Sequence, residues 1–247
     1  MSRDLEGAVV LVLGAVLARI TLEGSYLAYV KSNLFWPLLA TAVVLLCLGF
    51  ATIRERPSDP GAVIPQGADG SSSDGHTHAP PRLGVLLLAP VVVLILAAPA
   101  PLGAFAAERG SVNSIAQEFA AELPALTRNS GPTQLTISEF VLRTFAEGDA
   151  SVEGVLVELE GFVSRTEADG FVVARFAIAC CAADASPRQV RAIGAGPSVA
   201  SDDWVRATVI WNGDIVSGDG EARVPEVELV SVIPIEQPAV AYEYAVY

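Results

Sequence analysis

The feature that most constrains this chain is an uninterrupted run of 20 uncharged residues, Leu34–Ile53. A helix of about 20 apolar residues is long enough to cross the hydrocarbon core of a bilayer. Trp36 lies near the start of the run and Arg54 follows its end, as is typical where a helix enters and leaves the membrane interface. The sequence therefore predicts a membrane-spanning helix here, with the lipid bilayer as a partner.

Two further stretches predict spans, which makes three transmembrane helices in all. Residues 83–107 contain no charged side chain. The first span, about residues 7–22, is interrupted by Arg19, and Glu23 follows four positions later. On a helix this spacing places Arg19 and Glu23 on one face, where they can pair. Either Arg19 extends to the membrane interface, or the pair faces a partner protein within the membrane.

The predicted loop between the second and third spans, residues 54–82, is rich in Pro, Gly and Ser, as flexible linkers are. It contains three arginines, so the positive-inside rule places it and the N-terminus in the cytoplasm. We therefore expect a multi-pass protein of the cell membrane whose C-terminal domain is extracytoplasmic. The two histidines of the chain, His76 and His78, fall in this loop, and two ligands in a linker do not make a closed metal site.

Charge divides the chain into two unlike parts. Residues 1–110 carry 7 basic and 8 acidic side chains, whereas residues 111–247 carry 8 basic and 20 acidic ones, a net charge of −12. Nucleic acid is excluded as a partner, because phosphate binding needs a basic surface. No histidine occurs after residue 110 and no enzyme motif is present, so the expected protein is not an enzyme and has no catalytic residues.

The pattern after the third span predicts an α+β membrane protein with a β-rich C-terminal domain. Residues 108–150 form a helical connector, with helices predicted at 111–126 and 136–147 from apolar residues spaced three to four apart. Alternation of period two then predicts strands. They lie at 151–163, 170–179, 189–193, 203–211 and 224–235. Five short strands, the first containing Gly161, favour a small closed barrel of the OB type over 151–247, with an open sandwich as the alternative.

Adjacent Cys180 and Cys181, followed by Asp184, are the residues with the most distinctive chemistry. They have three interpretations: a strained vicinal disulfide, a thiolate site for a soft ion such as zinc, or two small residues packed at a strand end. Neighbouring residues of a regular strand point to opposite faces, so shared coordination requires the strand to end here. Asp184 can supply a third ligand, and the pair Asp202-Asp203 is a candidate for another.

The sequence RFAIACCAADA at 175–185, together with Tyr29-Val30 and APAPLGAFAA at 98–107, resembles the YcgQ-type bacterial family of predicted permease subunits. The resemblance covers nearly the whole chain. It implies a permease encoded beside the protein as its partner, and a link to metal transport. Members often carry a His-rich loop between spans two and three, where this chain keeps His76 and His78 alone.

These observations predict a non-catalytic accessory subunit of a two-component membrane permease. Cys180, Cys181 and Asp184 would contact a cation or the permease, with zinc or another soft metal as the cation, and Arg19 with Glu23 would form a partner interface. Two alternatives stay open: a membrane-anchored thiol redox protein using the cysteine pair, and a purely structural assembly protein in which that pair is core.

Overall fold

The structure is a computed structural model that describes residues 3–54, 100–110, 112–113, 123–126, 131–146, 148, 151–217 and 223–244. The chain divides into two compact units. The first contains residues 1–25 and 33–99, and the second contains residues 26–32 and 100–247. The short segment 26–32, between two helices of the first unit in the sequence, thus belongs to the second unit.

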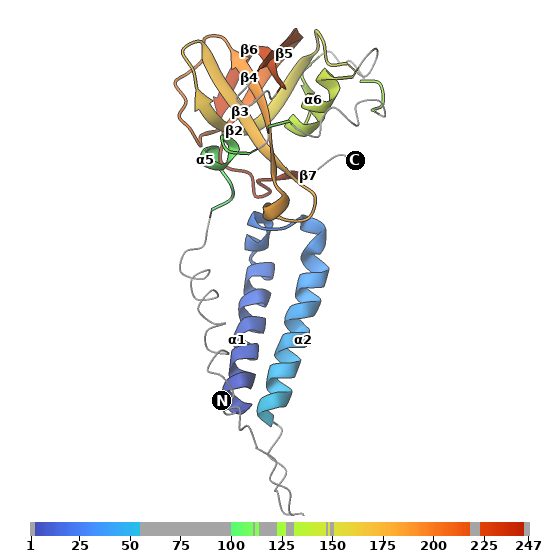
Figure 1. Ribbon diagram of the computed structural model, residues 1–247, viewed down its shortest axis with the longest axis vertical. Coiled ribbons are helices and arrows are strands. Elements are labelled where there is room, and N and C mark those ends of the chain that lie inside the picture. The colour runs from blue at the N-terminus through green and yellow to red at the C-terminus, as the bar shows by residue number, and fades with distance from the viewer. Residues whose placement is uncertain are drawn as a thin grey trace, which may run out of the picture. The chain divides into compact units, whose positions relative to one another are not determined.

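In the helical unit, α1 (Arg3–Leu22) and α2 (Phe35–Arg54) run antiparallel side by side (Figure 1). Small residues allow their backbones to approach closely, as in many membrane helix pairs. A Cβ added at Gly14 would lie 3.0 Å from Leu46, and one added at Gly49 would lie 2.8 Å from Leu11. Close packing at these glycines therefore holds the pair together.

Within the described residues, one helical stretch, Ser32–Arg54, is long and apolar enough to cross a membrane, with a mean hydropathy of 2.3. The expectation of three such helices is corrected to one. The helix expected at 7–22 exists as α1, which is not among the stretches that meet this test. Of the third predicted span, residues 83–99 lie outside the described residues, and its last four residues form the short helix α5 (Ala104–Ala107) of the second unit. Ala104 and Ala107 are buried there against the barrel.

The second unit contains a closed barrel of five strands. They are β2 (Leu156–Thr166), β3 (Gly170–Ile178), β4 (Ser186–Ile193), β5 (Trp204–Ser217) and β6 (Arg223–Pro234). Their order is β2-β5-β6-β4-β3, and pairing of β2 with β3 closes the ring. All neighbours are antiparallel except β4 and β6, which pair in parallel. The predicted closed barrel is thus confirmed.

Two features of the sequence explain how the barrel closes. Gly161 lies in β2, where an added Cβ would be 2.6 Å from the carbonyl oxygen of Ala174 and 2.7 Å from Ile137. A side chain would not fit there, as expected for a glycine at a close approach of two strands. The pairing of β5 with β6 shifts register between Trp211 and Ile215, which marks a bulge.

Several predicted boundaries were wrong, and the continued pairing of β5 with β6 explains one of them. The turn residues at 212–214 do not end β5, which passes through them as a bulge while the Trp211 indole donates to the Asp214 carbonyl oxygen at 2.7 Å. The first strand begins at Leu156 instead of 151, and β4 begins three residues earlier than expected. Of the helix predicted at 111–126, most lies outside the described residues, and 123–126 are not helical.

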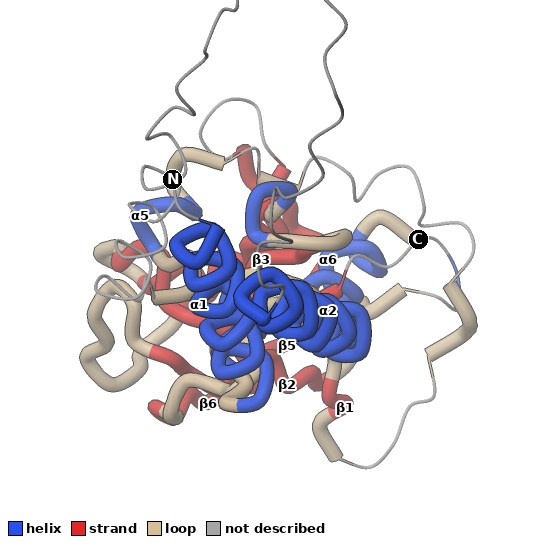
Figure 2. Tube along the Cα trace, turned by 90° about the horizontal axis from the view of Figure 1, so that it is seen from below, coloured by secondary structure: helices blue, strands red, loops and turns tan. Residues whose placement is uncertain are grey.

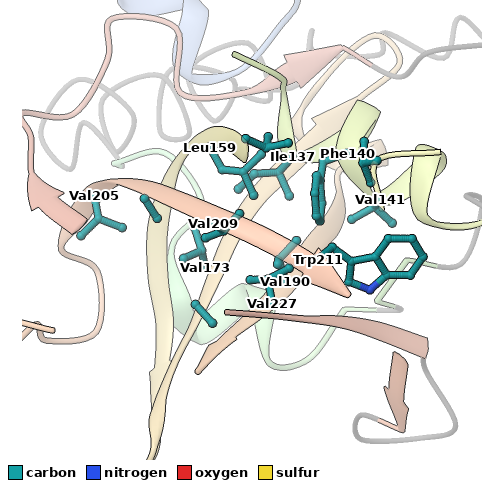
Figure 3. Packing of buried hydrophobic residues seen from close by; sticks show 14 of the residues in the cluster. Ile137, Phe140, Val141, Leu159, Val173, Val190, Val205, Val209, Trp211 and Val227 are labelled. Carbon is teal, nitrogen blue, oxygen red and sulfur yellow. The ribbon is translucent and has the colours of Figure 1, made fainter. Parts of the chain in front are cut away.

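The one long helix described in the second unit, α6 (Ile137–Thr144), packs on the barrel and is shorter than the 136–147 predicted. Its N-cap is Thr136, whose side chain accepts a hydrogen bond from the backbone of Glu139 at 3.1 Å. Figure 3 shows Ile137, Phe140 and Val141 directed toward the strand residues of the core. In Figures 1 and 2, α5 and α6 lie on different sides of the strands.

Two very short strands extend the barrel sheet. β1 (Thr133–Gln134) pairs in parallel with β2, and β7 (Glu243–Tyr244) pairs in parallel with β3. The register of the second pair sets Glu243 opposite Ala177 and Tyr244 opposite Ile178. Because β3 leads directly into the cysteine pair, β7 brings the C-terminal end of the described chain to that region.

Candidate functional site

Cys180 and Cys181 lie just beyond the end of β3, which finishes at Ile178. A single 3-10 turn, η5 (Ala182–Asp184), follows and reverses the chain before β4. The two cysteines are therefore not held in regular strand geometry, and their side chains need not point to opposite faces. The turn also carries Asp184 back toward Cys180.

The turn brings the three predicted ligand side chains together. The two Sγ atoms are 3.7 Å apart, and the Cys180 Sγ lies 2.9 Å from the Asp184 Oδ2. One potential ligand atom of each residue falls within 4.8 Å of the other two. Cys180 and Asp184 are exposed and Cys181 is half-buried. Among the described residues, this is the group of cysteines and carboxylates whose geometry suits a metal ion.

The Asp184 carboxylate organises the loop. It accepts hydrogen bonds from three consecutive backbone N–H groups: Ala179 at 2.8 Å, Cys180 at 2.8 Å and Cys181 at 3.1 Å. Partial burial acts to raise its pKa, but the hydrogen bonds from the Cys180 thiol and these N–H groups outweigh it, and the pKa falls to about 2. Asp184 is therefore ionised throughout the neutral range.

The same contact has the opposite effect on Cys180. Its hydrogen bond to the Asp184 carboxylate, and a weaker one to Cys181, favour the protonated thiol and raise the pKa of Cys180 to about 11. At neutral pH the side chain is a thiol. A redox or nucleophilic cysteine normally has its pKa lowered instead, because the thiolate is the reactive form.

This arrangement predicts how Cys180 reacts. At pH 8 we expect Asp184→Asn to accelerate its alkylation by iodoacetamide by one to two orders of magnitude, roughly the change in thiolate fraction when the pKa falls from about 11 to the ordinary value of 9.0. Mass spectrometry of the labelled peptide measures the rate, and Asp202→Asn is the matched control. An unchanged rate in Asp184→Asn would contradict the role assigned to the carboxylate.

The structure does not bring the other acidic candidates to the site. Asp202 Oδ1 accepts from the Ala104 backbone N–H at 2.6 Å, where α5 begins, and Asp203 Oδ2 accepts from Ala200 at 2.7 Å. Both carboxylates thus have structural hydrogen bonds, and the expectation that one of them is a ligand is corrected. His76 and His78 lie outside the described residues. Arg19 and Glu23 pair at 2.9 Å with both side chains more than half exposed.

Residues 29–31, which the sequence did not single out as part of the site, lie along the cysteine loop and bind its backbone. Val30 and Cys181 form an isolated antiparallel bridge. The Lys31 N–H donates to the Cys180 carbonyl oxygen at 3.1 Å, and the Ala182 N–H donates to the Tyr29 carbonyl oxygen at 2.7 Å. No local pattern predicts a contact over about 150 residues.

Two tyrosine hydroxyls from the C-terminal end fasten the same segment. Tyr242 donates to the Ala28 carbonyl oxygen at 3.1 Å, and Tyr244 donates to the Ser32 Oγ at 2.6 Å. The Tyr244 hydroxyl also accepts from the Ser32 backbone N–H at 3.1 Å. The Lys31 ammonium lies 4.7 Å from the centre of the Tyr244 ring. The cysteine loop, segment 26–32 and the C-terminal tyrosines therefore form one connected region.

These features define a class: a protein with a helix that can span a membrane and a closed five-stranded barrel, on which a Cys-Cys-x-x-Asp loop is exposed. A comparison with family models matches residues 117–245 to the DUF1980 C-terminal domain. The chain belongs to this family, which fits the YcgQ-type resemblance drawn from RFAIACCAADA. No curated protein and no solved structure matches the chain significantly.

Proposed function

We propose that this protein is a membrane-anchored, non-catalytic accessory subunit of a permease, which captures a soft metal cation on Cys180, Cys181 and Asp184. The observation that carries the proposal is the convergence of two thiols and an ionised carboxylate on one exposed loop. Thiolate ligands select ions such as Zn²⁺ and Cu⁺. The permease partner comes from the resemblance to YcgQ-type proteins.

The spacing of the ligand atoms suits tetrahedral coordination. Two thiolates at about 2.3 Å from Zn²⁺ lie about 3.8 Å apart, close to the 3.7 Å between the two Sγ atoms. A carboxylate oxygen bound to the same ion would lie about 3.5 Å from each sulfur. Asp184 Oδ2, at 2.9 Å from the Cys180 Sγ, needs to move by about half an ångström. Three protein ligands leave one position of a tetrahedron open, which suits a site that passes its ion on.

The surroundings support cation capture over thiol redox chemistry. Asp184 supplies negative charge beside the thiols, and the raised pKa of Cys180 makes it a poor nucleophile when no metal is bound. A cation has to displace the thiol proton, so binding should strengthen as pH rises. The net charge of −12 on residues 111–247 would also raise the local concentration of cations, an effect that salt screens.

The finer architecture that we propose is an OB-like barrel. In chain order its strands pair first with second, second with third, third with fifth, fifth with fourth and fourth with first, and the third and fifth are parallel. OB barrels bind single-stranded nucleic acid with a basic groove and stacking aromatic side chains. The net charge of −12 on residues 111–247 does not suit such a groove. We place the barrel outside the cytoplasm on a multi-pass anchor, with Arg19 and Glu23 facing the permease.

The test is metal affinity of the full chain in detergent, under reducing conditions, by competition with a chromophoric zinc chelator. Wild type is expected to bind one Zn²⁺, and the Cys180→Ser/Cys181→Ser double variant to bind at least about 100-fold more weakly, since thiolates provide most of the affinity. Cys47→Ser is the matched control, because Cys47 lies in α2. Equal binding by wild type and the double variant, or none by either, would refute cation capture at this loop.

A further inference from the structure

Segment 26–32 is unusual for a connection between two helices. Such connections normally run over the surface and stay solvated. Here Tyr26 is buried and residues 27–32 are all half-buried, and the segment belongs to the same compact unit as the barrel. Three backbone residues, 29–31, run as a single antiparallel bridge along the cysteine loop. The segment is therefore a structural part of the candidate site.

Two groups hold the backbone of the cysteine pair by hydrogen bonds: the Asp184 carboxylate and segment 26–32. On one side, Asp184 accepts from the N–H groups of Ala179, Cys180 and Cys181. On the other, the Cys180 carbonyl oxygen accepts from Lys31, and Ala182 donates to Tyr29. The two sets of bonds meet at the peptide unit that joins Cys180 to Cys181, whose carbonyl oxygen accepts from Lys31 and whose N–H donates to Asp184. A shift of this peptide caused by one partner therefore alters its hydrogen bond to the other. A ligand on the cysteines competes directly for Asp184 Oδ2, which also accepts from the Cys180 thiol.

From this arrangement we infer that docking of segment 26–32 is coupled to the conformation and cation binding of the Cys180–Cys181 pair. The docked segment keeps the two Sγ atoms close together, and a cation bound to them strengthens the docking. The inference deepens the proposed function and rests on cation capture for its second half. The first half, control of the thiols by the segment, stands on the hydrogen bonds alone.

The coupling has a physical basis in the order that each partner imposes. An undocked segment leaves the Cys180 carbonyl oxygen and the Ala182 N–H to solvent, and the loop then samples conformations in which the two Sγ atoms diverge. Docking removes those conformations, so a cation that needs both thiols binds the docked state more tightly. By linkage, the cation must favour docking by the same factor. Residues 26–32 join α1 to α2 in the chain. Binding of a cation to the cysteines therefore also changes how firmly the connection between these two helices is docked.

The tests use the full chain in detergent and the variant Lys31→Pro, which removes the N–H that donates to the Cys180 carbonyl oxygen. Lys31→Ala is the matched control, because it keeps this N–H and removes the side chain alone, together with its contact with the Tyr244 ring. We expect Lys31→Pro to weaken Zn²⁺ binding about 10-fold, within the usual range for coupled sites, and Lys31→Ala to change it less than threefold. Tyr244→Phe, which removes both hydroxyl contacts to Ser32, is a second and milder way to weaken docking and should give an intermediate loss.

Two readouts separate this inference from the proposed function. Hydrogen exchange of residues 26–32 should slow about 10-fold when Zn²⁺ is added to wild type, as the reciprocal of the affinity change, and should not respond in the double cysteine variant. Alkylation of Cys181 without metal should be faster in Lys31→Pro than in Lys31→Ala. If wild type binds no Zn²⁺ but alkylation responds, cation capture fails and control of the thiols by the segment is supported. Unchanged alkylation together with unchanged Zn²⁺ affinity in both Lys31→Pro and Tyr244→Phe overturns the inference.

Discussion

Gly161→Val is expected to lower the free energy of unfolding of the barrel by about 3 kcal/mol, the upper part of the range for overpacked cores. An added Cβ would be 2.6 Å from the Ala174 carbonyl oxygen, which belongs to the neighbouring backbone and cannot rotate away. It would also be 2.7 Å from Ile137 and 2.8 Å from Val173, two fully buried core side chains. Relief therefore requires β2 and β3 to separate where the barrel closes.

The effect is measured by thermal unfolding of the full chain in detergent, followed by tryptophan fluorescence. Gly131→Ala is the matched control, because a Cβ there has no heavy atom of the described residues within 4 Å apart from its chain neighbours, and its effect should stay within about 0.5 kcal/mol. A loss in Gly161→Val no larger than that of the control would mean that β2 and β3 do not approach as closely as described.

Glu243→Ala is expected to cost about 3 kcal/mol, because it leaves two buried N–H groups without acceptors. The Glu243 carboxylate accepts from the Ile137 and Ser138 backbones at 2.8 and 2.7 Å, at the first turn of α6. The side chain is buried within the second unit. Thr136→Ala, which removes the local N-cap of the same helix, serves as comparison and should cost about 1 kcal/mol. Equal losses in the two variants would show that the buried carboxylate adds nothing beyond ordinary capping.

Glu243 also predicts a dependence of stability on pH. Burial, only partly opposed by hydrogen bonds from Ser138, raises its pKa above the ordinary value of 4.5. The folded state therefore binds this proton more tightly than the unfolded state does, and the stability it contributes is fully present below pH 4.5 and decreases as pH rises through the folded pKa. Lowering the pH from 7 toward 4.5 should stabilise wild type relative to Glu243→Gln, as chemical denaturation at each pH would show. The opposite sign would mean that the ionised carboxylate is the favoured form.

Local patterns were sufficient where the physics is local. The apolar run Leu34–Ile53 predicted α2 to within one residue at each end, and alternation of period two placed β3 and β6 closely. The pairing of Arg19 with Glu23 follows from helix periodicity alone, and the structure forms it. The meeting of Cys180 and Cys181 with Asp184 follows equally from a short break after a strand.

Long-range contacts decided the rest. A turn motif at 212–214 becomes a bulge because β6 continues to pair beyond it, and the end of the third predicted span becomes α5 because Ala104 and Ala107 find a buried place beside the barrel. Asp202 has the composition of a ligand, yet the α5 backbone takes its carboxylate.

The sequence by itself determined the elements and the chemistry: an apolar helix, five strands, an acidic domain and two adjacent thiols beside a carboxylate. Periodicity, charge and residue type set these features, and they act over a few positions. Only the tertiary structure decided that residues 29–31 bind the backbone of the cysteine loop, and that the C-terminal tyrosines hold segment 26–32 in place. These contacts join residues about 150 to more than 200 positions apart, a separation over which no local pattern of the sequence acts.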